Sequence, residues 1–132
     1  DYGVPVTINE LNLLDYWRDT LQPDKSQRCS YCYAVRMDET ARYAAEHGYD
    51  VFTTSLLISP YQDHELIVSM GEKAASRYGV KFYYEDFRPL YRKGRERARG
   101  KHWYMQKYCG CYYSYGESDH PKKPIYFTEN NL

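Results

Sequence analysis

The sequence predicts an α/β domain with a parallel sheet, because two strand patterns flank a helical pattern in the middle of the chain. Residues 50–59 (DVFTTSLLIS) are β-branched, aromatic and apolar on both faces, as expected of a strand inside a parallel sheet. Residues 80–85 (VKFYYE) show the next strand pattern. A strand–helix–strand unit of this kind forms a right-handed crossover between parallel strands. The 132 residues have the length of one domain.

The helix between these strands should begin at Pro60, with Gln62 placed for a capping box, and end at Gly79. Its buried stripe should consist of Leu66, Ile67, Met70, Ala74 and Tyr78. Ligands of parallel sheets bind beyond the carboxyl ends of the strands. The side chains expected at that edge are Ser59, Tyr61, Gln62 and His64 after the first strand, and Asp86 and Arg88 after the second.

The N-terminal region is expected to contain a short strand and a helix. Val4 and Val6 alternate with polar or turn residues, which favours a strand, and Asn9 can cap the helix that follows. The apolar face of that helix would consist of Leu11, Leu14, Trp17 and Leu21. Residues 22–28 carry turn residues without periodicity and should form a loop.

All four cysteines lie in two close pairs, Cys29-x-x-Cys32 and Cys109-Gly110-Cys111. A helix is expected from about residue 30 to residue 47, ended by Gly48 and packed closely through Ala41, Ala44 and Ala45. The first cysteine pair would share a face at the start of this helix, where the helix dipole stabilises thiolates.

Three chemistries fit the two cysteine pairs. Four thiolates can hold a structural zinc ion, and they can equally hold an iron–sulfur cluster. The third chemistry is a thiol–disulfide couple at Cys109 and Cys111, for which Gly110 supplies the backbone freedom to close a small ring. The simplest alternative is four unrelated reduced cysteines.

Residues 88–101 form a basic stretch with seven cations against one acid. Its cations are Arg88, Arg92, Lys93, Arg95, Arg97, Arg99 and Lys101, with Tyr91, Trp103 and Tyr104 alongside. Basic side chains bind phosphates and aromatic rings stack on bases, so this composition favours RNA over the alternative of an ordinary solvated helix face. The 17 tyrosines of the chain suit half-buried surfaces that stack planar groups.

The overall charge balance predicts no partner, since 18 basic residues face 18 acidic ones. No apolar stretch reaches the length of a membrane span, and the first residues lack the basic and apolar regions of a signal peptide. Close cysteine pairs in such a chain indicate a metal or redox site. We therefore expect a cytoplasmic protein.

Four blocks of sequence resemble the QueH type of the epoxyqueuosine reductase family. The blocks are Arg28-Cys29-x-x-Cys32-Tyr33, residues 52–65 (FTTSLLISPYQDHE), Asp86-Phe87-Arg88 and residues 106–111 (QKYCGC). They follow the family's order and cover roughly residues 25–115. The long block and the Cys-Gly-Cys block are specific, whereas a C-x2-C pair alone would not be.

The resemblance implies a cobalamin-independent reductase that converts epoxyqueuosine to queuosine at the wobble position of tRNA. The implied fold is Rossmann-like, of the HUP (adenine-nucleotide-hydrolase-like) kind. The implied cofactor is a [4Fe–4S] cluster with Cys29 and Cys32 among its ligands, and the family leaves room for an additional iron. Cys109 and Cys111 would be either further metal ligands or a redox-active disulfide pair. A low-potential ferredoxin or flavodoxin would supply the electrons.

The remaining site residues are expected from the strand ends and the basic stretch. His64 and Asp86 are candidate proton donors for the catalytic step, beside the catalytic cysteines Cys109 and Cys111. The candidate tRNA contacts are Tyr61, Gln62, Arg88, Arg92, Lys93, Arg95, Tyr104 and Lys107. A zinc or thiol-redox domain that binds RNA without this catalysis is the alternative function.

One departure from the family pattern concerns the N-terminal part. Members of the family open with a strand that ends in a Cys-Cys-x-Pro-Cys motif, and this chain has no such motif. We therefore expect residues 1–117 to form an N-terminally incomplete domain that lacks its first strand and some cluster ligands. Residues 118–132 should form an extended tail.

Overall fold

The computed structural model describes residues 2–9 and 24–118. The chain divides into two compact units, one of residues Gln22–Gln106 and one that combines Asp1–Leu21 with Lys107–Leu132. The helix predicted after Asn9 and all but the first residue of the predicted tail lie outside the described residues.

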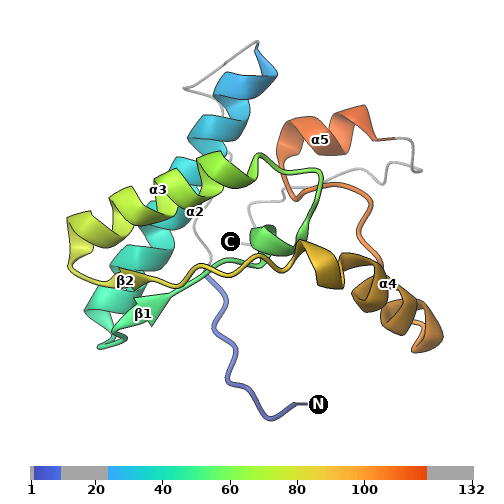
Figure 1. Ribbon diagram of the computed structural model, residues 1–132, viewed down its shortest axis with the longest axis horizontal. Coiled ribbons are helices and arrows are strands. Elements are labelled where there is room, and N and C mark those ends of the chain that lie inside the picture. The colour runs from blue at the N-terminus through green and yellow to red at the C-terminus, as the bar shows by residue number, and fades with distance from the viewer. Residues whose placement is uncertain (1, 10–23, 119–132) are drawn as a thin grey trace, which may run out of the picture. The chain divides into compact units, whose positions relative to one another are not determined.

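The unit Gln22–Gln106 is a small α/β structure (Figure 1). Its elements in chain order are α2 (Lys25–Glu46), β1 (Val51–Phe52), the 3₁₀ helix η1 (Ser55–Ile58), α3 (His64–Tyr78), β2 (Lys81–Phe82), the 3₁₀ helix η2 (Arg88–Leu90) and α4 (Tyr91–Gly100). The two strands are parallel, with Val51 opposite Lys81 and Phe52 opposite Phe82. This confirms the predicted α/β class and the parallel pair, within a two-stranded sheet.

Both strands are much shorter than predicted. Within residues 50–59 the strand ends at Phe52. Thr54 then caps the 3₁₀ helix η1 by accepting a hydrogen bond from the Leu56 N–H at 3.2 Å. Leu57 in this helix is fully buried. The prediction of one long strand was wrong because a short apolar run fits a buried helical turn as well as a buried strand. Residues 80–85 likewise pair only at Lys81–Phe82.

Helix α3 begins later than predicted. Asp63 is its N-cap, and the Asp63 carboxylate accepts a hydrogen bond from the Leu66 N–H at 3.0 Å, which satisfies a free donor of the first turn. The roles predicted for Pro60 and Gln62 were therefore wrong. The predicted end is confirmed, because Gly79 has the left-handed conformation with φ of 69°.

Helix α2 begins at Lys25, earlier than predicted, and takes up part of the predicted loop. Cys29 and Cys32 are thus the fifth and eighth residues of the helix rather than its first turn. The stabilisation of thiolates by the helix dipole falls off within the first turn, so it does not act on this pair as predicted. The end at residue 47 is confirmed, with Gly48 at φ of 74° behind it.

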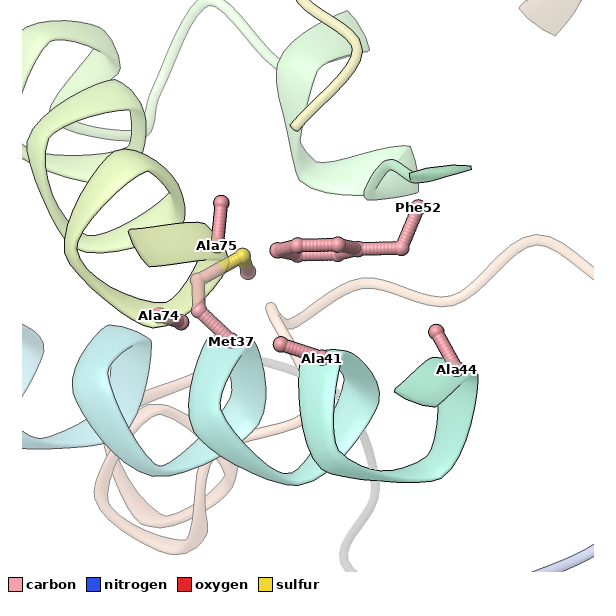
Figure 2. Packing of buried hydrophobic residues seen from close by; sticks show 6 residues of the cluster. All are labelled: Met37, Ala41, Ala44, Phe52, Ala74 and Ala75. Carbon is pink, nitrogen blue, oxygen red and sulfur yellow. The ribbon is translucent and has the colours of Figure 1, made fainter. Parts of the chain in front are cut away.

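The main core lies between α2, α3 and β1 (Figure 2). Its buried members are Met37, Ala41 and Ala44 of α2, Ala74 and Ala75 of α3, and Phe52 of β1. The small alanine side chains let the two helices approach closely, as predicted for Ala41 and Ala44, whereas Ala45 is exposed. A second core cluster of Tyr33, Leu57 and Ile67 lies next to the region of the candidate site.

In the other unit the structure describes residues 2–9 and a short helix, α5 (Tyr112–Glu117). The strand predicted at Val4 and Val6 is wrong, because residues 2–9 form no strand and both valines are exposed. Across the described residues, no helix combines the length and the apolar character that crossing a bilayer requires.

Candidate functional site

The C-x2-C pair lies on one face of α2, three residues apart. Cys32 is buried, whereas Cys29 is half-buried and packs against the cluster of Tyr33, Leu57 and Ile67. Neither cysteine is part of a disulfide within the part of the chain that the structure describes. The helix therefore presents two sulfur atoms from one face, with one of them accessible from outside.

Tyr33, the residue after Cys32, connects this helix to the loop before α3. The Tyr33 hydroxyl donates a hydrogen bond to Gln62 Oε1 at 2.5 Å and accepts one from the Asp63 N–H at 3.3 Å. The Tyr33 side chain is 3% exposed, so these bonds are shielded from water. The cysteine helix and the loop that leads to His64 are thus joined by a buried hydroxyl.

His64, the first residue of α3, faces the end of β2. Its Nε2 lies 3.1 Å from the Tyr84 hydroxyl, and the two rings meet edge to face. The buried Nδ1 atom of His64 has no hydrogen-bond partner among the described residues. The sequence prediction that the two strand ends meet is confirmed here, because His64 follows β1 and Tyr84 follows β2.

Asp86 and Arg88 form an exposed ion pair at the same edge. The Arg88 guanidinium donates to both Asp86 oxygens, at 2.8 and 2.7 Å, and the Arg88 N–H adds a bond at 3.1 Å. The side-chain hydrogen bond from Arg88 is the main cause that lowers the pKa of Asp86 to about 2, and His64 contributes a smaller Coulombic effect. Asp86 is therefore a carboxylate at neutral pH.

The basic stretch forms η2 and α4, and its cations are exposed. On this helix Arg92 pairs with Glu96 at 3.1 Å, and Arg95 donates to the Tyr91 hydroxyl at 2.9 Å while lying over its ring. The Tyr91 ring also meets Tyr61 edge to face, at a centroid distance of 5.8 Å. This contact brings the loop after β1 to the start of the basic helix.

Exposed aromatic side chains follow the basic helix. Lys101 lies over the Trp103 ring at 4.8 Å, and Tyr104 is 83% exposed. Exposed rings beside cations are suited to stacking on nucleic-acid bases. The predicted combination of charge and aromatic surface is thus present in this unit.

The Cys-Gly-Cys turn lies in the other unit, just before α5. Gly110 has φ of 89°, a conformation that favours glycine. Ser114 of α5 binds the turn at three points: its hydroxyl accepts from the Cys109 N–H at 3.3 Å, donates to the Cys111 carbonyl at 3.1 Å and lies 3.0 Å from Cys109 Sγ. The turn is thereby held in one shape.

The two sulfur atoms of this turn differ in environment. Cys109 is half-buried and Cys111 is buried. A hydrogen bond with Cys109, followed by burial, raises the pKa of the Cys111 thiol well above its ordinary value. The Cys111 thiol therefore keeps its proton at neutral pH unless a metal ion replaces that proton. Lys107, a predicted RNA contact, is exposed just before this turn.

Three functional candidates were missed by sequence reasoning: Tyr33, Tyr84 and Ser114. Each of them lies close to a predicted residue, either in sequence or in space. The spacing of residues in a sequence does not show which hydroxyl groups will form such contacts. Within each unit, the described residues contain no group of three or more histidine, cysteine or acidic side chains placed to hold one metal ion. Each unit contains two of the four thiols, and thiols are the ligands that iron–sulfur clusters use.

The fold and the cysteines define a class: a small α/β protein with two thiol pairs, a strand-end histidine and a basic aromatic surface. The sequence model of the family described as epoxyqueuosine reductase QueH matches residues 1–117. The chain belongs to this family.

Several curated relatives carry the name epoxyqueuosine reductase QueH. The protein of Dehalococcoides mccartyi is 37% identical over 120 residues, which are 90% of this chain and 65% of that protein. The protein of Haemophilus influenzae is 34% identical over 74% of this chain and 41% of its own length, and that of Thermotoga maritima is 35% identical over 67% and 47%. The chain thus spans between about two fifths and just under two thirds of these relatives.

Proposed function

We propose that this chain takes part in the reduction of epoxyqueuosine to queuosine at the wobble position of tRNA, the final step of queuosine synthesis. The observation that carries the proposal is the family match over residues 1–117, a range that includes both cysteine pairs and the strand-end residues. The reaction converts an epoxide into an alkene and water and consumes two electrons and two protons. A low-potential donor of the ferredoxin or flavodoxin class would supply the electrons, in the cytoplasm where tRNA is modified.

The cysteines are the proposed ligands of a [4Fe–4S] cluster. Such a cluster supplies electrons one at a time and needs no cobalamin. Cys29 and Cys32 fit it because they are thiols on one helix face with one sulfur accessible. Cys109 and Cys111 would either complete the ligand set, with room for an additional iron, or act as a redox-active thiol pair. The Ser114 contacts hold the turn that carries this pair in one conformation.

His64 is the proposed proton donor to the leaving oxygen, and Asp86 has a different role. A carboxyl with a pKa of about 2 has no proton to give at neutral pH, so Asp86 orients Arg88 instead. The hydrogen bond between the Tyr84 hydroxyl and Nε2 orients the ring of His64. Its second nitrogen, Nδ1, is buried and has no hydrogen-bond partner among the described residues.

The basic stretch of η2 and α4, together with exposed tyrosines beside it, is the proposed docking surface for the anticodon stem-loop. Arg88, Arg92, Lys93 and Arg95 would bind phosphates, while Tyr61 and Tyr104 would stack on bases. We also propose that the parallel pair β1–β2 belongs to a Rossmann-like sheet of the HUP kind, since its strands are parallel and joined through a helix.

The test of this function measures metal content and turnover together. The chain is purified without oxygen, its intact mass is recorded, and iron, zinc and acid-labile sulfide are measured per chain. Iron and sulfide near four each, with conversion of epoxyqueuosine in tRNA that is lost in Cys32→Ala, would support the proposal. One zinc ion per chain without sulfide, together with RNA binding but no turnover, would instead indicate a structural zinc domain. Turnover that survives iron chelation would indicate a thiol-redox enzyme.

A further inference from the structure

The hydrogen bonds of the Tyr33 hydroxyl determine which way the Gln62 amide points. A backbone N–H can only donate, so the Tyr33 oxygen accepts from Asp63. The single proton of Tyr33 is then directed to Gln62, which has to present its oxygen. The Gln62 Nε2 group therefore points away from Tyr33 with both of its hydrogens.

This orientation of the Gln62 amide is stable because the Tyr33 side chain that fixes it is buried. Gln62 itself is only half-buried. Rotating the amide would place its nitrogen against the Tyr33 hydroxyl and would lose the 2.5 Å hydrogen bond that this hydroxyl donates to Gln62 Oε1. Among the described residues, Gln62 Nε2 has no hydrogen-bond partner of its own. Gln62 thus offers a donor at the strand-end edge, two residues before His64.

We propose that Tyr33 is a positioning residue that makes Gln62 a hydrogen-bond donor to the epoxide oxygen of the substrate. This inference rests on the proposed function and goes beyond it, because it assigns how the site distinguishes substrate from product. An epoxide oxygen has no hydrogen and can only accept, so an amide N–H recognises it. The alkene product lacks this oxygen and leaves the donor without a partner.

The test compares two anticodon stem-loops, one with epoxyqueuosine and one with queuosine. Their affinities for the metal-loaded protein are measured by fluorescence anisotropy without an electron donor, so that no turnover occurs. One hydrogen bond to a neutral acceptor corresponds to about a 3- to 10-fold preference for the epoxide. The ratio of the two affinities does not depend on the folded fraction, because the same folded molecules bind both RNAs.

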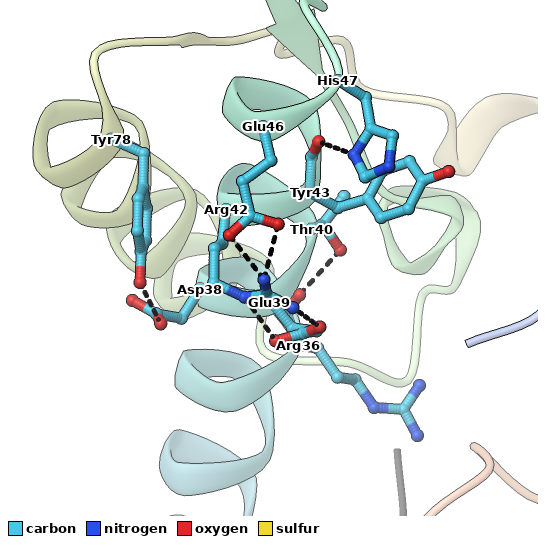
Figure 3. Close-up of polar contacts among 9 residues, drawn as sticks. All are labelled: Arg36, Asp38, Glu39, Thr40, Arg42, Tyr43, Glu46, His47 and Tyr78. Carbon is cyan, nitrogen blue, oxygen red and sulfur yellow. Dashed lines mark hydrogen bonds and ion pairs between the residues drawn. The ribbon is translucent and has the colours of Figure 1, made fainter. Parts of the chain in front are cut away.

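Four proteins carry the comparison: the wild type, Gln62→Glu, Tyr33→Phe and Tyr78→Phe. Gln62→Glu keeps an acceptor for Tyr33 but removes the donor, so the preference should disappear or reverse. Tyr33→Phe removes the hydroxyl that orients the Gln62 amide, so the ratio of the two RNA affinities should come close to one. Tyr78 is the matched control, because its hydroxyl also joins α3 to α2 through a 2.8 Å bond to Asp38 away from the site (Figure 3). Tyr78→Phe should keep the wild-type ratio.

The outcomes separate this inference from the proposed function. If the wild type prefers the epoxide RNA and Tyr33→Phe keeps that preference as Tyr78→Phe does, the role of Tyr33 is refuted. An unchanged ratio in Gln62→Glu refutes the role of Gln62. A wild type that binds neither stem-loop overturns the proposed function itself, and the inference with it.

Discussion

Gly71 of α3 lies directly against the ring of Phe82 on β2. A methyl group at residue 71 would come within 2.8 Å of three atoms of that ring, closer than packed carbons approach. Phe82 in turn contacts Phe52 of the core, with ring centroids 5.3 Å apart. The absence of a side chain at Gly71 therefore sets how closely the helix approaches the sheet.

Gly71→Ala should destabilise the protein although alanine is the better helix former. Alanine contributes about 1 kcal/mol within a helix relative to glycine, whereas overpacking a core contact costs about 1–3 kcal/mol. The expected net loss in the free energy of unfolding is about 1 kcal/mol, measured by urea denaturation. Gly94→Ala on α4 is the control, because nothing lies within 4 Å of its Cβ position and the change should be neutral or stabilising.

Ser114→Ala should loosen the Cys-Gly-Cys turn. The substitution removes the acceptor for the Cys109 N–H and the donor to the Cys111 carbonyl. Losing about 1 kcal/mol of local stability corresponds to roughly fivefold faster hydrogen exchange at the Cys109 amide, as read by NMR. Ser114→Thr retains the hydroxyl and should stay near the wild-type rate. Equal exchange in all three proteins would show that the serine does not hold the turn.

The Asp86–Arg88 pair should make stability depend on pH in the acidic range. The pKa of Asp86 is about 2 in the folded chain, below its ordinary value. A lowered pKa stabilises the fold above the unfolded pKa of about 4, and this contribution is lost as the pH falls from about 4 towards 2. In Arg88→Gln the Asp86 carboxyl signal in ¹³C NMR should titrate at higher pH. A midpoint that does not move would mean that another group lowers the pKa.

Sequence reasoning succeeded where one local rule decides the structure and failed where tertiary contacts decide it. Gly79 was predicted to end α3 because only a left-handed residue closes a helix in that way, and it does so. The start of α3 was missed because Pro60, Gln62 and Asp63 all suit a helix start, and the choice among them depends on Tyr33 from another helix.

The same difference between local rules and tertiary contacts applies to the candidate site. The strand-end pairing of His64 with the segment after β2 could be predicted, because parallel strands bring their carboxyl ends to one edge. Its partner Tyr84 could not be, since the strand pattern of residues 80–85 gave no indication of where β2 ends. The length of β1 was overestimated because the apolar residues Leu56 and Leu57 are compatible with a buried helical turn.

The basic helix α4 should contribute an electrostatic part of RNA binding. Arg92 and Arg95 are exposed on this helix, and each holds only a local partner that a phosphate can replace. Replacing both by alanine should weaken binding of the anticodon stem-loop. It should also reduce the dependence of log K on log salt by about 0.7–0.9 for each phosphate that these arginines neutralise. Isothermal titration at several salt concentrations measures both quantities.

Arg42 and Arg77 provide the matched control for this pair. Both are solvent-accessible arginines of the same unit away from the basic helix: Arg42 is engaged by Glu39 and Glu46 on α2 (Figure 3), and Arg77 by Asp38. The double change Arg42→Ala with Arg77→Ala removes the same charge and should leave the salt dependence unchanged. If both double variants lower the slope equally, the protein's overall charge rather than α4 attracts the RNA. If neither does, RNA binds at another surface, because every phosphate neutralised by α4 would add its own share to the salt dependence.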